Sequence, residues 1–246
     1  MEIIQITDLH INNNTSQNKH GCCPHERLNV LLNEIKNNHG NNANLVITGD
    51  LSSDYSKKSY ENIKTSLKQY DFKISLLPGN HDDLKIMKDI CDDQIFLDPI
   101  KINNSNFIAI NIDTHVQDNV QGYIKENELE KIENKINGIS ENVIFFTHHP
   151  LIKINSLWID MNSTKNNNSL IQLMLKRSDL LFFVFSGHVH QEFHHKISNI
   201  EFFTSPSTCY QFKSRSSSFA IDKDASYGYR VISLHGNSLN TEVIRL

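Results

Sequence analysis

The 246-residue sequence lacks long apolar runs and long basic runs. Its longest apolar stretch, residues 179–186, is far shorter than the roughly 20 residues of a membrane-spanning helix. The start of the sequence has neither the charged nor the apolar region of a signal peptide, so we expect a cytoplasmic protein without a membrane partner. Basic residues number 24 against 28 acidic ones, so we expect no nucleic-acid polymer as partner.

Cysteine is scarce, and its spacing carries no motif. Cys22 and Cys23 are adjacent, whereas Cys91 and Cys209 are isolated, which matches neither a zinc knuckle nor a disulfide framework. This pattern is typical of a protein in a reducing cytosol. No repeat and no proline- or glycine-rich linker divides the chain, so we expect residues 1–246 to form a single domain.

Hydrophobic residues make up 38% of the sequence and fall in short, β-rich runs. These runs predict strands at residues 3–7, 45–48, 74–77, 107–112, 143–147, 181–185, 201–204, 229–234 and 241–246. Helical periodicity predicts helices at residues 24–36, 60–69 and 125–136. Asparagine-rich stretches at residues 12–14, 37–44 and 166–168 are interpreted as solvated loops, as are His20 and His25. The alternation of strand and helix favours an α/β fold.

Short polar clusters follow five of the predicted strands. They are Asp8-Leu9-His10, Gly49-Asp50, Gly79-Asn80-His81-Asp82, His148-His149-Pro150 and Gly187-His188-Val189-His190. Residues just past the carboxyl ends of strands in an open α/β sheet converge on one crevice, so we expect the clusters to share one site. Their carboxylate, amide and imidazole groups suit iron, manganese or zinc.

The spacing within two clusters predicts where their side chains point. Asp8 and His10 are two residues apart, and so are His188 and His190. In an extended segment this spacing puts both side chains on the same side of the backbone. The glycine that precedes three of the polar residues lets the backbone come close to a metal or a phosphate.

Each cluster taken alone has a simpler interpretation. An Asp-x-His pair is more often a surface pair, Gly-Asp is a common turn, and the segment around Asn80 fits a polar turn. The Gly-His-x-His cluster is a stronger indication of a metal site, because two imidazoles on one face of a strand end rarely aid packing. The ordered set of five is much more specific than any member.

That ordered set resembles the signature of the calcineurin-like metallophosphoesterase superfamily, D-x-H, G-D, G-N-H-D/E, H and G-H-x-H, over nearly the whole chain. The sequence is most similar to the bacterial class III 3′,5′-cyclic AMP phosphodiesterases, through residues 7–10, 205–212 and 228–230. Residues 205–212 are more simply explained as a buried strand and turn than as a substrate contact. The resemblance implies a four-layer α/β/β/α sandwich with two metals at the strand ends.

Carried over by position, the resemblance implies two sets of metal ligands that share Asp50. The first set is Asp8, His10, Asp50 and His190, and the second is Asp50, Asn80, His148 and His188. His148 is preferred to His149 because the family places its ligand at the first histidine before the proline. We expect two divalent cations per chain, iron or manganese, with zinc as the alternative.

This ligand chemistry predicts a hydrolytic reaction. Two cations about 4 Å apart lower the pKa of a bridging water and clamp phosphoryl oxygens. We expect the resulting hydroxide to attack 3′,5′-cyclic AMP in line, expel the ribose 3′ oxygen and leave 5′-AMP. Asn80 and His81 are the expected substrate contacts, and His81 is the candidate to protonate the leaving oxygen. The alternative for His81 is a structural hydrogen bond beside the metal.

Two other functions stay open at this stage. One is a broader metallophosphoesterase that acts on other nucleotides or on phosphomonoesters, because the metal core does not read what lies beyond the phosphate. The other is a binding scaffold without catalysis, which is disfavoured because every ligand position is filled. The sequence leaves undetermined the base preference, the oligomeric state, and the roles of Asp54 and of the loop that carries Cys22 and Cys23.

Overall fold

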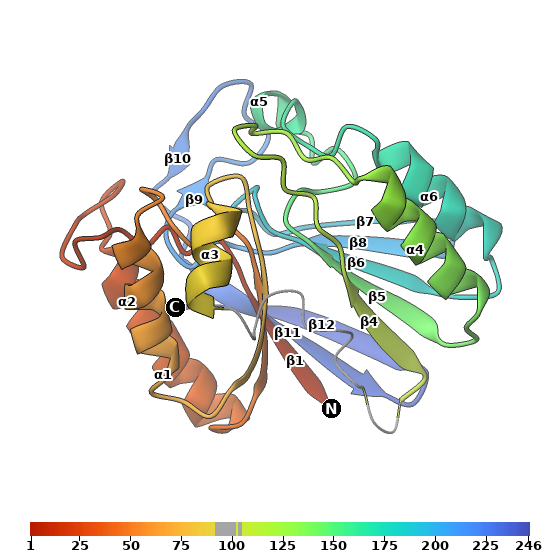
Figure 1. Ribbon diagram of the computed structural model, residues 1–246, viewed down its shortest axis with the longest axis horizontal. Coiled ribbons are helices and arrows are strands. Elements are labelled where there is room, and N and C mark those ends of the chain that lie inside the picture. Colours follow the sequence, from red (N-terminus) through yellow and green to blue (C-terminus); the bar gives the residue numbers. More distant parts are fainter. Residues whose placement is uncertain (92–101, 103–104) are drawn as a thin grey trace.

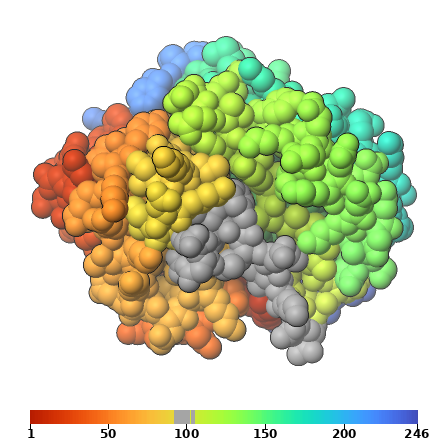
Figure 2. All heavy atoms as spheres, in the orientation of Figure 1, coloured from red at the N-terminus to blue at the C-terminus, as the bar shows by residue number. Residues whose placement is uncertain are grey.

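Two five-stranded sheets stack face to face, and helices cover their outer sides (Figure 1). The computed structural model describes residues 1–91, 102 and 105–246. In the space-filling view, the orange and yellow atoms of the first helices and the green atoms of the later segments occupy opposite sides of the visible face (Figure 2). The helices of the first half of the chain therefore cover one sheet, and later helices cover the other.

The first sheet combines the beginning of the chain with its end. Its strands are β1 (Glu2–Ile6), β2 (Asn44–Thr48), β3 (Lys73–Leu77), β11 (Gly228–His235) and β12 (Ser238–Arg245), in the order β12-β11-β1-β2-β3. β1, β2 and β3 run parallel, whereas β11 runs antiparallel to both of its neighbours. Because β11 pairs with β1, we propose that residues 1–246 form one domain.

Helices α1 (Pro24–His39), α2 (Lys57–Leu67) and α3 (Leu84–Cys91) lie against the first sheet. Pro24 opens α1, where a missing N–H costs nothing and the fixed φ suits the first turn. Leucines and an isoleucine recur at helical spacing along α1 and are buried. Ser56 caps α2 by accepting a hydrogen bond from the backbone N–H of Ser59.

The second sheet contains β4 (Phe107–Asn111), β5 (Asn142–Thr147), β6 (Phe182–Ser186), β7 (Phe193–Ile197) and β8 (Ile200–Thr204), in the order β4-β5-β6-β8-β7. All neighbours are parallel except β7 and β8. Helices α4 (Glu126–Asn137) and α6 (Asn167–Lys176) lie against this sheet, whereas the short α5 (Leu157–Asp160) packs in a separate apolar cluster with residues 209–212. β9 (Gln211–Phe212) and β10 (Ile221–Asp222) form a separate short ladder.

Apolar side chains fill three layers between these elements. One lies between the first sheet and α1 to α3, and another between the second sheet and α4 and α6. The third lies between the two sheets, and its members include Ile3, Val46, Leu77, Ile144, Phe146, Phe185 and Ile232. β5 and β6 are buried on both faces, which explains their nearly continuous apolar sequences. The expected four-layer α/β/β/α sandwich is therefore confirmed.

Most predicted strands and helices are present within a few residues of their predicted bounds. The sequence analysis missed α3, α5, α6, β7 and the short ladder of β9 and β10. Residues 12–14 lie outside the helices and strands, so the loop is confirmed, but only residues 13 and 14 are exposed and Asn12 is buried.

Two other loop interpretations are confirmed for residues 40–43 and 166 and are wrong for the remaining residues of the two stretches. α1 extends to His39, β2 begins at Asn44, and α6 begins at Asn167. Asn166 exchanges hydrogen bonds with the backbone of Ile124, and this tertiary contact fixes the start of α6. His20 is exposed as expected, whereas His25 is half-buried in the first turn of α1.

Candidate metal centre

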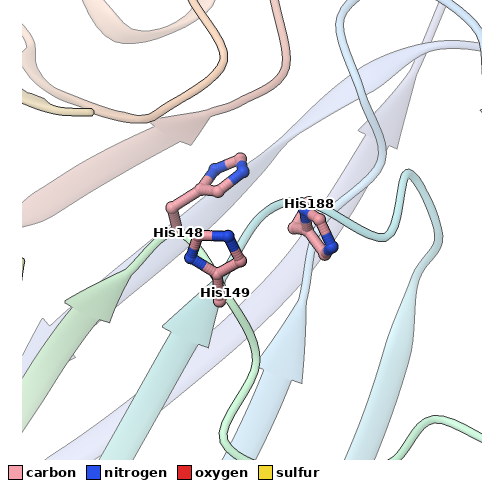
Figure 3. A group of neighbouring side chains, drawn as sticks. All are labelled: His148, His149 and His188. Carbon is pink, nitrogen blue, oxygen red and sulfur yellow. The ribbon is translucent and has the colours of Figure 1, made fainter. Parts of the chain in front are cut away.

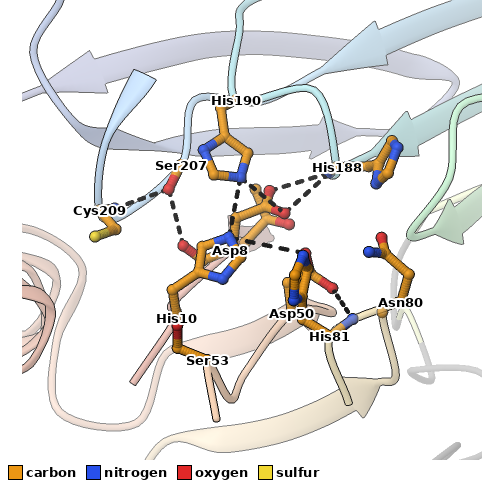
Figure 4. A network of polar contacts seen from close by, with 12 residues as sticks. Asp8, His10, Asp50, Ser53, Asn80, His81, His188, His190, Ser207 and Cys209 are labelled. Carbon is orange, nitrogen blue, oxygen red and sulfur yellow. Dashed lines mark hydrogen bonds and ion pairs between the residues drawn. The ribbon is translucent and has the colours of Figure 1, made fainter. Parts of the chain in front are cut away.

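The five polar clusters meet at one end of the two stacked sheets. Residues of four clusters are labelled in Figure 4, and His148 and His149 of the fifth cluster are labelled in Figure 3. Three of the clusters follow β1, β2 and β3 of the first sheet, and two follow β5 and β6 of the second sheet. The predicted residues brought together in this way are Asp8, His10, Asp50, Asn80, His81, His148, His188 and His190. The convergence expected at the carboxyl ends of the strands is confirmed.

The predicted extended geometry of the Asp-x-His and His-x-His clusters is wrong. Asp8 and His10 have φ values of 56° and 49°, and His188 and His190 have 69° and 47°. These values lie in the left-handed region, where a side chain with a Cβ costs about 1–3 kcal/mol. Hydrogen bonds from the N–H groups of Asp8 and His10 to the segment after β2 hold this backbone. The segments turn sharply after their strands and still aim their side chains at one point.

The first group of candidate ligands consists of Asp8, His10 and His190. Their ligand atoms all lie within 4.8 Å of one another, and all three residues are buried. Nε2 of His190 lies 3.1 Å from Nε2 of His10 and 3.5 Å from Oδ1 of Asp8. Nδ1 of His190 donates to the carbonyl oxygen of Tyr210 at 2.7 Å, which leaves Nε2 as the ring nitrogen directed at Asp8.

The second group gathers around His148. Nδ1 of His148 donates to the carbonyl oxygen of Thr48 at 2.7 Å. Nε2 of His148 lies 3.3 Å from Oδ1 of Asp50 and 3.2 Å from Oδ1 of Asn80. The ring of His188 lies 5.1 Å from that of His148, and its buried Nε2 has no hydrogen-bond partner in the part of the chain that the structure describes.

These contacts bring hydrogen-bond acceptors together. In the unprotonated form that binds a metal, Nε2 of His148 and Nε2 of His190 would each turn a lone pair toward carboxylate or amide oxygens. Such contacts are repulsive unless a proton or a cation lies between the atoms. The donor set, buried oxygens facing buried imidazole nitrogens, therefore fits metal ions.

The pKa values of His10, His188 and Asp8 favour the forms that bind metals, whereas, against the effect of burial, the carboxylates of Asp50 and Asp8 raise the pKa of His148 in the absence of a metal. Burial lowers the pKa of His10 and His188 well below the ordinary histidine value, so both rings stay neutral. Burial raises the pKa of Asp8, but the neighbouring His190 outweighs it and lowers the pKa overall. Anionic carboxylates and neutral imidazoles are the protonation states that metals require.

Asp50 lies between the two groups. Oδ1 faces His148 at 3.3 Å, and Oδ2 faces His10 at 3.8 Å. The backbone N–H of His81 donates to Oδ1 at 2.8 Å and fixes the carboxylate (Figure 4). A Cβ on Gly79 would lie 2.2 Å from Oδ1 of Asp50, so a glycine is required where the segment after β3 passes the carboxylate.

His149 belongs to the same group of buried imidazoles as His148 and His188 (Figure 3). Its ring is already bonded to protein at both nitrogens. Nδ1 lies 2.8 Å from Oγ1 of Thr114, and Nε2 lies 3.1 Å from the carbonyl oxygen of Val120. His148 has one ring nitrogen directed at Asp50 and Asn80, whereas His149 has none left for a metal.

Sequence analysis missed the role of Asp82, the acid that ends the G-N-H-D motif. Its buried carboxylate accepts hydrogen bonds from the N–H groups of Leu51, Ser52 and Gly79 and from the hydroxyl of Tyr60. Burial, followed by the charge of Asp50, raises the pKa of Asp82 to about 6. Asp82 thus holds together the segments that follow β2 and β3.

Asp54 has a structural place in the described part of the chain. Its carboxylate accepts hydrogen bonds from the N–H of Asn13 and from the N–H and hydroxyl of Ser56. The Asp54 side chain therefore joins the loop after β1 to the start of α2. Among the residues that the structure describes, it makes no contact with His81.

Residues 205–212 are buried, as expected, and they form hydrogen bonds with Asp8 and His190 of the centre. Ser207 donates through its hydroxyl to the carbonyl oxygen of Asp8 at 2.8 Å, and the carbonyl oxygen of Tyr210 holds His190. The ring of Tyr210 stacks on that of His10, with centroids 5.4 Å apart. The Gln-Phe end of this run is the only part of it in a strand, namely β9.

Comparisons with known proteins agree with this geometry. Residues 1–192 match the family model described as calcineurin-like phosphoesterase. The chain is 31% identical over 245 residues to a protein of Nostoc sp. named 3′,5′-cyclic-nucleotide phosphodiesterase, covering 99% of this chain and 91% of that one. It is 28% identical to a Vibrio vulnificus protein named 3′,5′-cyclic adenosine monophosphate phosphodiesterase CpdA, covering 100% and 90%.

A solved structure shares the fold. The dimetal phosphatase from Danio rerio superposes with a TM-score of 0.73 at 11% identity, covering 98% of this chain and 95% of the other. Four layers, five ordered clusters at the strand ends and a family match over the first 192 residues lead to one conclusion. The chain belongs to the calcineurin-like phosphoesterase family.

Proposed function

We propose that the protein is a metal-dependent phosphodiesterase that hydrolyses 3′,5′-cyclic AMP to 5′-AMP. The observation that carries the proposal is the position of the Asp50 carboxylate between two groups of buried candidate ligands. One of its oxygens faces His10 of the first group, and the other faces His148 of the second group. The names of the full-length relatives from Nostoc and Vibrio support a cyclic nucleotide as substrate.

The ligand roles are part of this proposal. We assign Asp8, His10, Asp50 and His190 to one divalent cation, and Asp50, Asn80, His148 and His188 to the other. When bound there, two cations lower the pKa of a water molecule and neutralise phosphoryl oxygens. The buried Asp8 and Asp50 carboxylates supply the negative charge that attracts such cations. Iron and manganese suit this oxygen and nitrogen set, and zinc is the alternative.

His81 is the proposed general acid. Its backbone N–H is bonded to Asp50, which places the residue beside the centre, and its ring lies 5.3 Å from that of His10. The side chain is half-exposed, and neither ring nitrogen has a hydrogen-bond partner among the described residues. A ring free at both nitrogens can donate a proton to the 3′ oxygen that leaves during in-line attack by water.

The proposed partner is a small cyclic nucleotide. Within the described residues, no helix has both the length and the apolar character needed to cross a bilayer. The cytoplasmic location expected from the sequence stays a prediction.

The test is product identification after incubation of manganese-loaded protein with 3′,5′-cyclic AMP. Cyclic GMP, 2′,3′-cyclic AMP and an aryl phosphomonoester are run in parallel. Formation of 5′-AMP at a rate well above that with the other substrates would support the proposal. Cleavage of the monoester with cyclic AMP left intact would favour a broader phosphoesterase instead.

A further inference from the structure

The loop that contains Cys22 and Cys23 also contains Lys19, which lies near the candidate metal ligand His10. Lys19 and Cys22 form an antiparallel bridge, with the N–H of each residue bonded to the carbonyl oxygen of the other at 2.8 and 3.1 Å. The two residues between them, His20 and Gly21, have φ values of 50° and 87°. Positive φ at both central positions is typical of a type I′ turn, so Lys19 stands on a tight hairpin.

A contact between two cysteines joins this hairpin to residues 205–212, which hold the candidate ligand His190. Sγ of Cys22 lies 3.2 Å from the carbonyl oxygen of Lys19 and 3.2 Å from Sγ of Cys209. Cys209 precedes Tyr210, whose carbonyl oxygen holds His190. The position of the Lys19 backbone is thereby tied to the segment that orients a candidate metal ligand.

The side chain of Lys19 extends along the centre. Nζ donates to the hydroxyl of Ser53 and lies 5.7 Å from the centroid of the Tyr210 ring. That ring stacks on His10, and the N–H of Ser53 is bonded to the carbonyl oxygen of Ile11, the next residue along the chain. The ammonium group of Lys19 is therefore separated from the predicted metal ligand His10 by the ring of Tyr210.

This ammonium has no anionic partner. Among the described residues, no carboxylate oxygen lies within 4 Å of Nζ of Lys19. The side chain is half-buried, and burial lowers its pKa. The charges of Asp50 and Asp54 act on Lys19 only from beyond ion-pair distance, and its direct hydrogen-bond acceptor is a neutral hydroxyl. The ammonium therefore has capacity left to bind an anion.

We propose that Lys19 is a substrate-binding residue that contacts a phosphoryl oxygen of the phosphoester bound at the metal centre. The proposal rests on the proposed function, because the anion is the phosphodiester substrate or its monoester product. A lysine ammonium binds phosphate as a compact point charge, and the fixed hairpin lowers the cost of ordering it. The hairpin and the contact of Cys22 with Cys209 then hold Lys19 in place.

The experiment compares Lys19→Met, Lys19→Arg and Ser53→Ala with the unaltered protein, all loaded with manganese. The exposed Lys213→Met serves as the control for loss of one lysine charge. Steady-state constants are measured with cyclic AMP and with an aryl phosphodiester. Inhibition by inorganic phosphate and metal content are measured alongside. The aryl diester separates the two proposals, because its cleavage reports on the centre even where cyclic AMP is not the substrate.

We expect Lys19→Met to lower kcat/KM about ten- to a hundredfold and to weaken phosphate inhibition by a similar factor. Metal content should stay the same, Lys19→Arg should recover most of the loss, and Ser53→Ala and Lys213→Met should change little. Unchanged kinetics and phosphate inhibition in Lys19→Met would overturn the proposal. It would also be overturned if Ser53→Ala reproduced the full loss, or if Lys19→Met lost its metals, because Lys19 would then only tether the loop.

Discussion

The two sheets contribute different chemistry to the same centre. The segments after the first sheet supply the oxygen donors Asp8, Asp50 and Asn80 together with His10, whereas those after the second sheet supply only imidazoles. Neither sheet alone provides all the candidate ligands of either metal site. The centre therefore exists only where the apolar layer between the sheets holds their strand ends together.

The largest effect is expected from Asp50→Ala, which removes the carboxylate that faces both groups. Both metal ions should be lost, and turnover should fall about a thousandfold or more, because several kcal/mol of charge stabilisation disappear. Elemental analysis and turnover of the purified variant measure this. Asp54→Asn, a change in a carboxylate that holds loop backbone, should keep both metals. Full metal occupancy in Asp50→Ala would contradict the shared role.

His81→Ala tests a residue on the first-sheet side that we do not assign to a metal. Metal content should be unchanged, while turnover of cyclic AMP should fall about 10²- to 10⁴-fold, the usual contribution of a general acid. An aryl phosphodiester, whose leaving group needs no proton, should lose far less. Equal losses on both substrates would argue against proton donation, and unchanged turnover of cyclic AMP would remove His81 from the mechanism.

Adjacent histidines on the second-sheet side should behave in opposite ways. His148→Ala removes a ring directed at Asp50 and Asn80, so one metal and about a hundredfold of activity should be lost. His149→Ala should keep both metals but lower the free energy of unfolding by about 1–3 kcal/mol, because it removes the hydrogen bonds of the ring to the Thr114 hydroxyl and the Val120 carbonyl oxygen. Metal analysis and denaturant unfolding of the two variants separate these outcomes. Metal loss in His149→Ala alone would reverse the assignment.

A smaller effect is expected from pH in the metal-free protein. Burial lowers the pKa of His148, but the carboxylates of Asp50 and Asp8 outweigh it and raise the pKa above 6.5. A raised pKa contributes stability that is fully present below pH 6.5 and is lost as pH rises through the folded-state value. Denaturant unfolding of the metal-free protein at about pH 6 and about pH 8 should show this loss, and His148→Ala should lack it. The same stability difference in both proteins would exclude His148 as the source.

Sequence patterns predicted the sheets and the set of clusters because each depends on local signals. Strand positions in the core follow from apolar runs, and strand ends are marked by a change to polar residues. The backbone of Asp8 and His188 was not predictable in this way. Its left-handed conformation is held by hydrogen bonds between segments far apart in the chain, such as the N–H of His188 to the carboxylate of Asp8.

The supporting residues were hidden for the same reason. Asp82 is part of the G-N-H-D motif, but its hydrogen-bond partners Leu51 and Tyr60 come close to it only in the folded protein. Lys19 is one of many polar loop residues in the sequence, and its place over Tyr210 depends on the contact between Cys22 and Cys209. Long-range contacts therefore decided what the local pattern left open.

The central claim is that the two sheets together hold two cations that share Asp50. Anomalous diffraction at the manganese edge, from crystals grown with manganese, tests it most directly. We predict two peaks per chain, one beside His10 and His190 and the other beside Asn80 and His148, with the Asp50 carboxylate in contact with both. A single peak, or a peak bound by His149 and not by Asp50, would contradict the account.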